Sequence, residues 1–162
     1  MGRRRGVPPG DSRRFYDWLY RASEDMLAAK ILMENDHLCY KSSAFHCQQA
    51  IEKALKAYIL LCTGKLMDGH NLAWLCRQAM KEDEDFRLWM KKVSVLNHCY
   101  IETRYPPDIP FDMTYDQLKE AYRTAVELFR FICSQEEEEM EERYGAYTHA
   151  GAASGRVGED KE

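Results

Sequence analysis

The chain has 162 residues, 45% of them hydrophobic, which is enough apolar material for one domain with a real core. Its formal net charge is -4, but residues 1–14 carry +4 and residues 135–162 carry -6, so the stretch between them is nearly neutral. A domain this close to neutral has no global basic field for gripping nucleic acid, so any such binding must be local.

Six cysteines are scattered along the chain, none in a Cys-x-x-Cys pair, and their spacings fit no common zinc pattern. We therefore expect no metal site and no cofactor, and we interpret the thiols as small buried hydrophobes. We expect no secretory leader, because the Arg-rich start is followed by Pro and Gly, and we find no apolar stretch of about 18 residues that could span a membrane. These features predict a cytoplasmic protein without membrane contact.

Hydrophobic periodicity predicts helices, and no segment has the alternation of a strand. Residues 1–11 are rich in Arg, Gly and Pro without periodicity, so we expect a disordered basic lead. The first helix is predicted to begin near Ser12 or Arg13 and to end at 35–37. Its inward stripe is Phe15, Trp18, Leu19, Ala22, Met26, Ala29 and Met33.

A second helix is predicted from about Lys41 to Cys62. Ser42 or Ser43 can cap its start, and Gly64 suits the turn at its end. Its inward stripe is Ala44, Cys47, Ile51, Leu55, Tyr58 and Cys62.

A third, shorter helix is predicted over about 71–80 and a fourth over about 84–100. Pro106, Pro107 and Pro110 then exclude helix for several residues.

The fifth helix is predicted to begin after Thr114, a plausible N-cap. Its acidic extension over 136–142 is polar all round and should project into solvent, and the end from about Gly145 should be disordered. The sequence thus predicts an all-α protein, a five-helix antiparallel up-and-down bundle over 12–134, followed by an acidic helix extension and tail over 135–162.

Polar side chains gather on one face of the second helix. Gln48, Glu52 and Lys56 are four residues apart and stack on that face, with Gln49 and Lys53 beside them. The face could be an ordinary solvated surface with a weak Glu52–Lys56 pair. It could instead be the polar wall of a binding site.

A second candidate segment lies where the fourth helix must stop. Pro106 favours an extended conformation for Tyr105, which would turn the Arg104 guanidinium and the tyrosine ring off the helix axis. An Arg beside a Tyr offers a fork for phosphate and a surface for stacking. The alternative is a structural corner, in which Arg104 bonds helix-end carbonyls and Tyr105 packs on a neighbouring helix.

Three motifs in this order resemble the HEPN family. They are Ala-Phe-x-x-Gln-Gln-Ala-x-Glu-Lys-x-Leu-Lys at 44–56, Gly-His-x-Leu at 69–72, and Tyr-x-x-x-Arg-Tyr-Pro at 100–106. The resemblance covers residues 12 to about 134. It implies a homodimeric helical bundle of the kind often encoded beside a minimal nucleotidyltransferase and regarded as nucleotide- or substrate-binding.

Many HEPN relatives are ribonucleases, often toxins, that use an Arg and a His with four to six residues between them. That motif is absent here, because the corresponding positions after Arg104 hold Ile109, Pro110 and Phe111. The chain therefore resembles an Arg-Tyr-Pro branch of the family. We expect none of its residues to be catalytic. His70, between two turn-forming residues, is interpreted as a capping or packing residue.

The sequence therefore predicts a non-catalytic nucleotide- or RNA-binding module that forms a homodimer and acts with a nucleotidyltransferase partner, as in a toxin–antitoxin pair. The alternatives are a ribonuclease toxin with a degenerate active site, and a purely structural dimerisation module. The expected ligand-binding residues are Arg104, Tyr105, Tyr100, Gln49, Lys53, Lys56 and Glu52.

Overall fold

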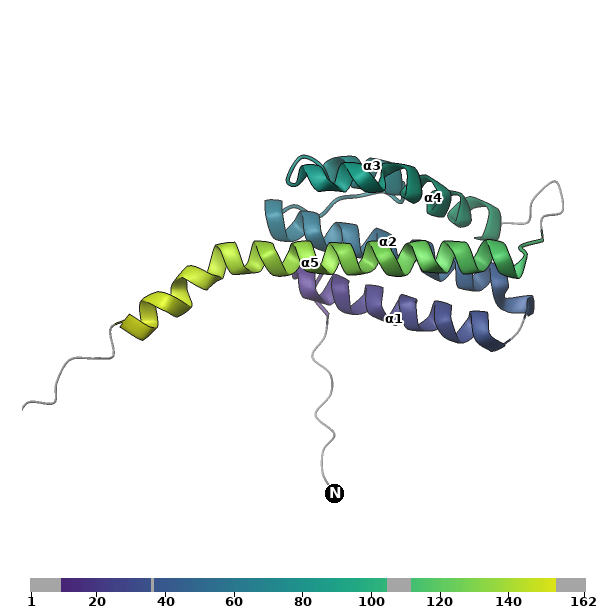
Figure 1. The fold of residues 1–162 in the computed structure, drawn as a ribbon, viewed down its shortest axis with the longest axis horizontal. Helices are drawn as coiled ribbons and strands as arrows, with labels where there is room; N and C mark the ends of the chain where they lie inside the picture. The colour runs from purple at the N-terminus through teal and green to yellow at the C-terminus, as the bar shows by residue number, and fades with distance from the viewer. Residues whose placement is uncertain (1–9, 36, 105–111, 154–162) are drawn as a thin grey trace, which may run out of the picture.

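The computed structural model describes residues 10–35, 37–104 and 112–153, with side chains described over 10–35, 38–98 and 112–143. Five α-helices lie in these ranges: α1 (Phe15–Asn35), α2 (Tyr40–Thr63), α3 (Leu72–Ala79), α4 (Met90–Arg104) and α5 (Tyr115–Ala153) (Figure 1). Two short 3-10 helices precede α2 and α4, namely η1 (His37–Cys39) and η2 (Glu84–Trp89). The described ranges contain no strand, so the predicted five-helix, all-α fold is confirmed.

The four long helices alternate in direction along the chain, with the short α3 inserted between α2 and α4 (Figure 1). Ser43 of α2 bonds the Ala29 carbonyl of α1, and His46 contacts Asp25, which sets these two helices antiparallel. After α2, the chain returns over 64–71 before α3 starts, so α3 does not continue the alternation. The result is an up-and-down bundle with one added helix.

The central element is α2, of whose 24 residues 15 are buried. Its apolar side chains join α1, α4 and α5 in one core, which explains why a single helix can be almost wholly enclosed. Aromatic rings close the end of this core nearest η2, where Phe86 contacts Tyr58 in a tilted arrangement and Phe131 edge to face. Burying rings of this size is a major part of the stability of a small bundle.

Two of the predicted helix ends are confirmed. Gly64 follows α2 with φ of 69°, and its N–H donates to the Leu60 carbonyl at 2.8 Å. A positive φ costs Gly nothing, which is why Gly ends helices in this way. At the start of α5, the Thr114 hydroxyl accepts from the Gln117 N–H, and the Gln117 side chain accepts from the Thr114 N–H, a capping box.

The predicted cap of α2 is wrong. Cys39 occupies the N-cap position without any side-chain cap bond. Ser43 is already inside the helix, and its hydroxyl donates to the Ala29 carbonyl at 2.7 Å. Ser43 is therefore an inter-helix contact in the core. The 3-10 turn η1 leads directly into α2, which moves the start of the helix ahead of both serines.

Three boundaries differ from the sequence prediction. The turn before α1 is held by Asp11, so α1 begins at Phe15. The predicted start of the fourth helix is the 3-10 turn η2, and α4 continues to Arg104. Finally, α5 continues through Gly145 to Ala153.

The acidic extension was expected to project into solvent, and this is wrong at one position. Glu136 is 3% exposed, because it lies one turn after Ile132 on the inward stripe of α5. Its neighbours Glu137, Glu138 and Glu142 are exposed as expected. Within the described ranges, no helix is long and apolar enough to cross a membrane.

Candidate functional site

The polar face of α2 is organised around a buried carboxylate. Glu52 is 4% exposed and accepts from Lys56 Nζ at 3.0 Å and from Gln48 Nε2 at 3.1 Å, and its Oε1 lies 2.9 Å from His70 Nδ1. Gln49 Nε2 lies 2.7 Å from the Gln48 amide oxygen and 3.4 Å from Glu52. Four side chains therefore converge on one carboxylate, which joins α2 to the loop before α3.

A second carboxylate joins α1 to α2. Asp25, on α1, is 8% exposed and contacts His46 Nδ1 at 2.8 Å and Lys53 Nζ at 2.5 Å. Both partners lie on α2 and remain half-buried. Because Lys53 is anchored in this way, its ammonium has a fixed position at the edge of the polar face.

Trp18 covers the polar face of α2 from the side of α1. The Lys56 ammonium lies 5.6 Å from the centre of its ring, and the indole N–H donates to the Ser12 carbonyl at 3.0 Å. A cation over a tryptophan face is attracted by the ring quadrupole. Trp18 thus links the start of α1 to the buried Glu52–Lys56 pair.

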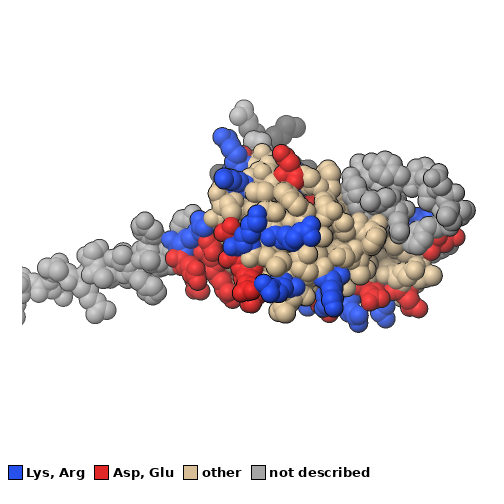
Figure 2. All heavy atoms as spheres, turned by 90° about the horizontal axis from the view of Figure 1, so that it is seen from above, with Lys and Arg blue, Asp and Glu red and all other residues tan. Residues whose placement is uncertain are grey.

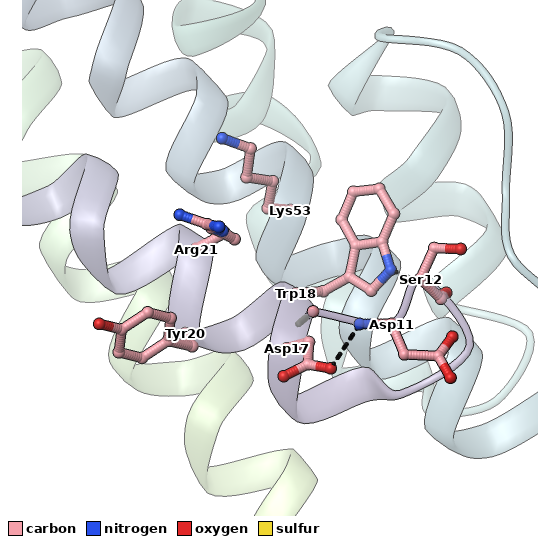
Figure 3. Close-up of a pocket in the computed structure, with 8 residues that line it drawn as sticks. Asp11, Ser12, Asp17, Trp18, Tyr20, Arg21 and Lys53 are labelled. Carbon is pink, nitrogen blue, oxygen red and sulfur yellow. Dashed lines mark hydrogen bonds between the residues drawn. The ribbon is translucent and has the colours of Figure 1, made fainter. Parts of the chain in front are cut away.

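A pocket of about 240 Å³ opens beside Trp18 (Figure 3). Trp18, Tyr20 and Arg21 from α1 line it together with Lys53 from α2, and the segment 10–12 closes one side. The lining balances two acids, Asp11 and Asp17, against the two cations. It combines flat aromatic surface with positive charge, a combination suited to a planar ring that carries an anionic group.

One of the two alternatives for this face of α2, an ordinary solvated surface, is wrong for three of its five residues. Gln48 is fully buried, Glu52 and Lys56 are nearly so, and only Gln49 and Lys53 keep some exposure. The cause is tertiary: Trp18 covers one side of the face and the loop carrying His70 covers the other.

The Arg-Tyr-Pro corner lies largely outside the described residues. Tyr105 is not described, and for Tyr100 and Arg104 only the helical backbone is described, with Arg104 the last residue of α4. Figure 1 places the end of α4 at the end of the bundle where α2 begins. Lys53 lies about 20 Å further along α2 at 1.5 Å per residue. Within one chain, the backbone at Arg104 and the Trp18 pocket therefore lie apart.

Sequence reasoning missed the part played by His70. The cap of α3 is Asn71, whose side chain accepts from the Trp74 N–H, so His70 does not cap the helix. Its ring binds Glu52, and its carbonyl accepts from Gln48. The clue in the sequence was the Gly-His pair before α3, but only the fold brings it to Glu52.

Three of the cysteine thiols lie in surroundings that disfavour the thiolate. Burial raises the pKa of the Cys62, Cys76 and Cys133 thiols to about 11, so none of them is an activated nucleophile. Among the described side chains, no three His, Cys, Asp or Glu residues gather in a group that could hold a metal ion.

The fold is a small helical bundle whose second helix carries the buried polar residues Gln48, Glu52 and Lys56. The model of the HEPN domain family matches residues 15–140. The chain belongs to the HEPN domain family, as the motifs at 44–56, 69–72 and 100–106 predicted.

Individual relatives agree with this assignment. The Methanocaldococcus jannaschii protein named "Putative toxin MJ1304" is 30% identical over 96 residues, which cover 55% of this chain and 61% of that protein. The chain thus matches less than two thirds of that relative's length. The crystal structure of TT1696 from Thermus thermophilus superposes with a TM-score of 0.64 at 30% identity, covering 76% of this chain and 98% of that one. ST0689, an archaeal HEPN homologue, is similar in fold, with a TM-score of 0.59 at 23% identity over the same shares.

Proposed function

We propose that this HEPN domain is a non-catalytic nucleotide- or RNA-binding module. It acts as a homodimer beside a nucleotidyltransferase partner, in a toxin–antitoxin-like pair. The observation that carries the binding proposal is the pocket of about 240 Å³ whose lining includes Trp18, Tyr20, Arg21 and Lys53. The Arg-Tyr-Pro motif at 104–106 and the name of the Methanocaldococcus relative support the wider assignment.

In the proposed complex, a base stacks on Trp18, and its phosphate is held by Arg21 and Lys53. Arg21 now pairs with Glu24 at 2.8 Å, and both side chains are well exposed. An exposed pair of this kind is worth under about 1 kcal/mol, so the guanidinium can turn to a phosphate at little cost. Lys53 is held by Asp25 and supplies a positioned charge. Arg104, the last residue of α4, and Tyr105 after it in the sequence would take a second phosphate of a longer ligand.

Trp18→Ala should weaken binding of AMP, ATP or a short single-stranded RNA about 5- to 150-fold, because a stacked base is worth roughly 1–3 kcal/mol.

Arg104→Ala should weaken RNA binding about 10- to 150-fold through the loss of a charge-assisted phosphate contact. Calorimetric titration measures both variants, with the melting temperature recorded on the same samples. The matched control is Arg77→Ala, an exposed arginine of α3, which should leave affinity unchanged. If folded Trp18→Ala protein binds these ligands with unchanged affinity, then the pocket beside Trp18 is not their binding site. If Arg104→Ala is unstable but its folded fraction binds with unchanged affinity, then Arg104 has a structural role and does not bind the ligand.

A ribonuclease toxin is the second candidate, and the contact between His70 and Glu52 favours it. A carboxylate bound to Nδ1 fixes the orientation of an imidazole, as in catalytic dyads that use histidine as a general base. In this alternative, His70 takes the role of the histidine that the absent Arg-x(4–6)-His motif would provide. If this function holds, wild-type protein should cleave single-stranded RNA, and His70→Ala should lower the rate by about 100-fold or more. If the wild type does not cleave RNA, or if His70→Ala cleaves it equally well, then the ribonuclease function based on His70 is excluded and the binding function stands.

A further inference from the structure

The charges that line the Trp18 pocket are separated along its length. Arg21 and Lys53 lie together at one end, and Asp11 and Asp17 lie together at the other (Figure 3). The two acids are joined directly, because the Asp11 N–H donates to Asp17 Oδ2 at 2.8 Å. A phosphate is attracted to the basic end and repelled from the acidic end, so the pocket fixes the direction in which a nucleotide lies.

The surface outside the pocket has the same order of charge. The start of α1 lies at the end of the bundle from which the tail of α5 departs (Figure 1), and Figure 2 shows acidic side chains gathered at that end. The acidic end of the pocket, formed by Asp11 and Asp17, is therefore the end nearest these acids. A phosphate is driven away from it, toward Arg21 and Lys53.

The distance between the two ends matches one nucleotide. The Lys53 ammonium is held by Asp25, which lies eight residues after Asp17 on the same helix. At 1.5 Å per residue, the two carboxylates are about 12 Å apart along the axis of α1. A nucleoside monophosphate spans such a distance from its phosphate to the far edge of its base. The α-amino and carboxylate groups of a free amino acid are attached to one carbon atom and cannot reach both ends.

The acidic end has acceptor capacity to spare. Asp17 Oδ2 accepts from the Asp11 N–H and from Arg14 Nε at 2.9 Å, which closes the turn before α1. The other oxygen, Oδ1, has no hydrogen-bond partner among the described residues, and an ionised carboxylate accepts at both oxygens. Asp11 is bonded by Arg13, whose side chain is 88% exposed, so this pair is weak and readily exchanged. Both acids can therefore accept from N–H groups of a ligand.

The pattern of donors decides which base fits two neighbouring carboxylates. The Watson–Crick edge of guanine has two adjacent donors, N1–H and the 2-amino group. Adenine and cytosine each have one amino group beside a ring nitrogen that accepts, and uracil has one N–H between two carbonyls. A carboxylate repels these acceptors, because it is itself only an acceptor. Guanine is therefore the common base that matches the acidic end.

We infer that Asp17 is the specificity-determining residue of the Trp18 pocket, and that the ligand class it selects is a guanine nucleotide. Asp17 Oδ1 accepts from guanine N1–H, and the adjoining Asp11 carboxylate accepts from the 2-amino group. The base stacks on Trp18, and its phosphate lies between Arg21 and Lys53. This inference rests on the proposed binding function and adds the identity of the base.

Calorimetric titration with GMP, IMP and AMP tests the inference, because IMP is GMP without the 2-amino group. The wild type should bind GMP about tenfold or more tightly than IMP or AMP, since each of these loses a hydrogen bond to a charged acceptor. In Asp17→Asn, the amide oxygen can keep the bond from the Asp11 N–H, which turns the amide NH2 toward the donors of guanine. The affinity for GMP should then fall to within about threefold of that for IMP.

The matched control is Glu34→Gln, which removes an exposed carboxylate from α1 outside the pocket and should leave all three affinities unchanged. If the wild type binds the three nucleotides equally, or if the preference for GMP survives in Asp17→Asn, the inference is overturned while the binding function stands. If Asp17→Asn weakens GMP and IMP by the same factor, Asp17 only holds the turn before α1, and the inference is again overturned. A wild type that binds neither nucleotides nor RNA would overturn the binding function and the inference together.

Discussion

Glu136→Gln should raise the free energy of unfolding by about 3 kcal/mol at pH 7, which is roughly 6–12 °C in melting temperature for a chain of this size. Glu136 is 3% exposed, and neither carboxylate oxygen has a hydrogen-bond partner among the described residues. Burial therefore raises the pKa of this carboxyl from 4.5 to about 8. At pH 7 the folded chain must keep a proton that the unfolded chain has released.

The pH dependence of stability follows from this difference. Between about pH 4.5 and pH 8 the folded state holds one more proton than the unfolded state at this site. Wild-type stability should therefore fall as pH rises through this window, and the contribution should be level above it. Gln resembles the protonated carboxyl but cannot ionise, so the gain from the substitution should be under about 1 kcal/mol at pH 5.

Urea unfolding of wild type and Glu136→Gln at pH 5, 7 and 8.5 tests this expectation. The control is Glu142→Gln, which removes an exposed carboxylate from the same stretch of α5 and should change stability by about 0.5 kcal/mol or less at each pH. If the wild type and Glu136→Gln lose stability in parallel across this range, then Glu136 has a stabilising partner when ionised.

The fold followed from the sequence because its determinants are local. The periodicity of the five helices, Gly64 after α2 and Thr114 before α5 are each set within a few residues. The serine cap of α2 failed because Ser43 found a carbonyl on another helix, a contact that no local pattern contains. The preference of serine for the N-cap is not realised where a tertiary contact uses the same hydroxyl.

The candidate site was only partly predictable for the same reason. Helical spacing places Glu52 and Lys56 on one face, but whether that face is wet depends on Trp18 and on the loop with His70, both distant in sequence. Glu136 was missed because a run of four glutamates appears uniformly solvated, although its first member continues the inward stripe of Ile132.

Glu52→Leu should destabilise the protein by about 3–5 kcal/mol, because it leaves the Lys56 ammonium buried without its carboxylate. The Lys56 side chain is 8% exposed and the Glu52 side chain 5%, with 3.0 Å between nitrogen and oxygen. Gln48 and His70 would lose their acceptor as well. Glu52→Leu combined with Lys56→Met should recover much of the loss, since replacing both members of a buried pair by apolar residues removes the unpaired charge.

The chain contains a matched control for this pair. Lys92 and Glu127 are also 3.0 Å apart, but their side chains are 50% and 46% exposed. Glu127→Leu should therefore cost under about 1 kcal/mol, because water solvates the lysine that is left. Chemical denaturation of the single and double variants of both pairs yields two coupling energies. A large coupling at Glu52–Lys56 beside a small one at Lys92–Glu127 would establish burial as the cause. If the two coupling energies are equal, or if the losses at Glu52 and Lys56 are additive, then water reaches the polar face of α2. In that case Glu52 and Lys56 are accessible to a ligand.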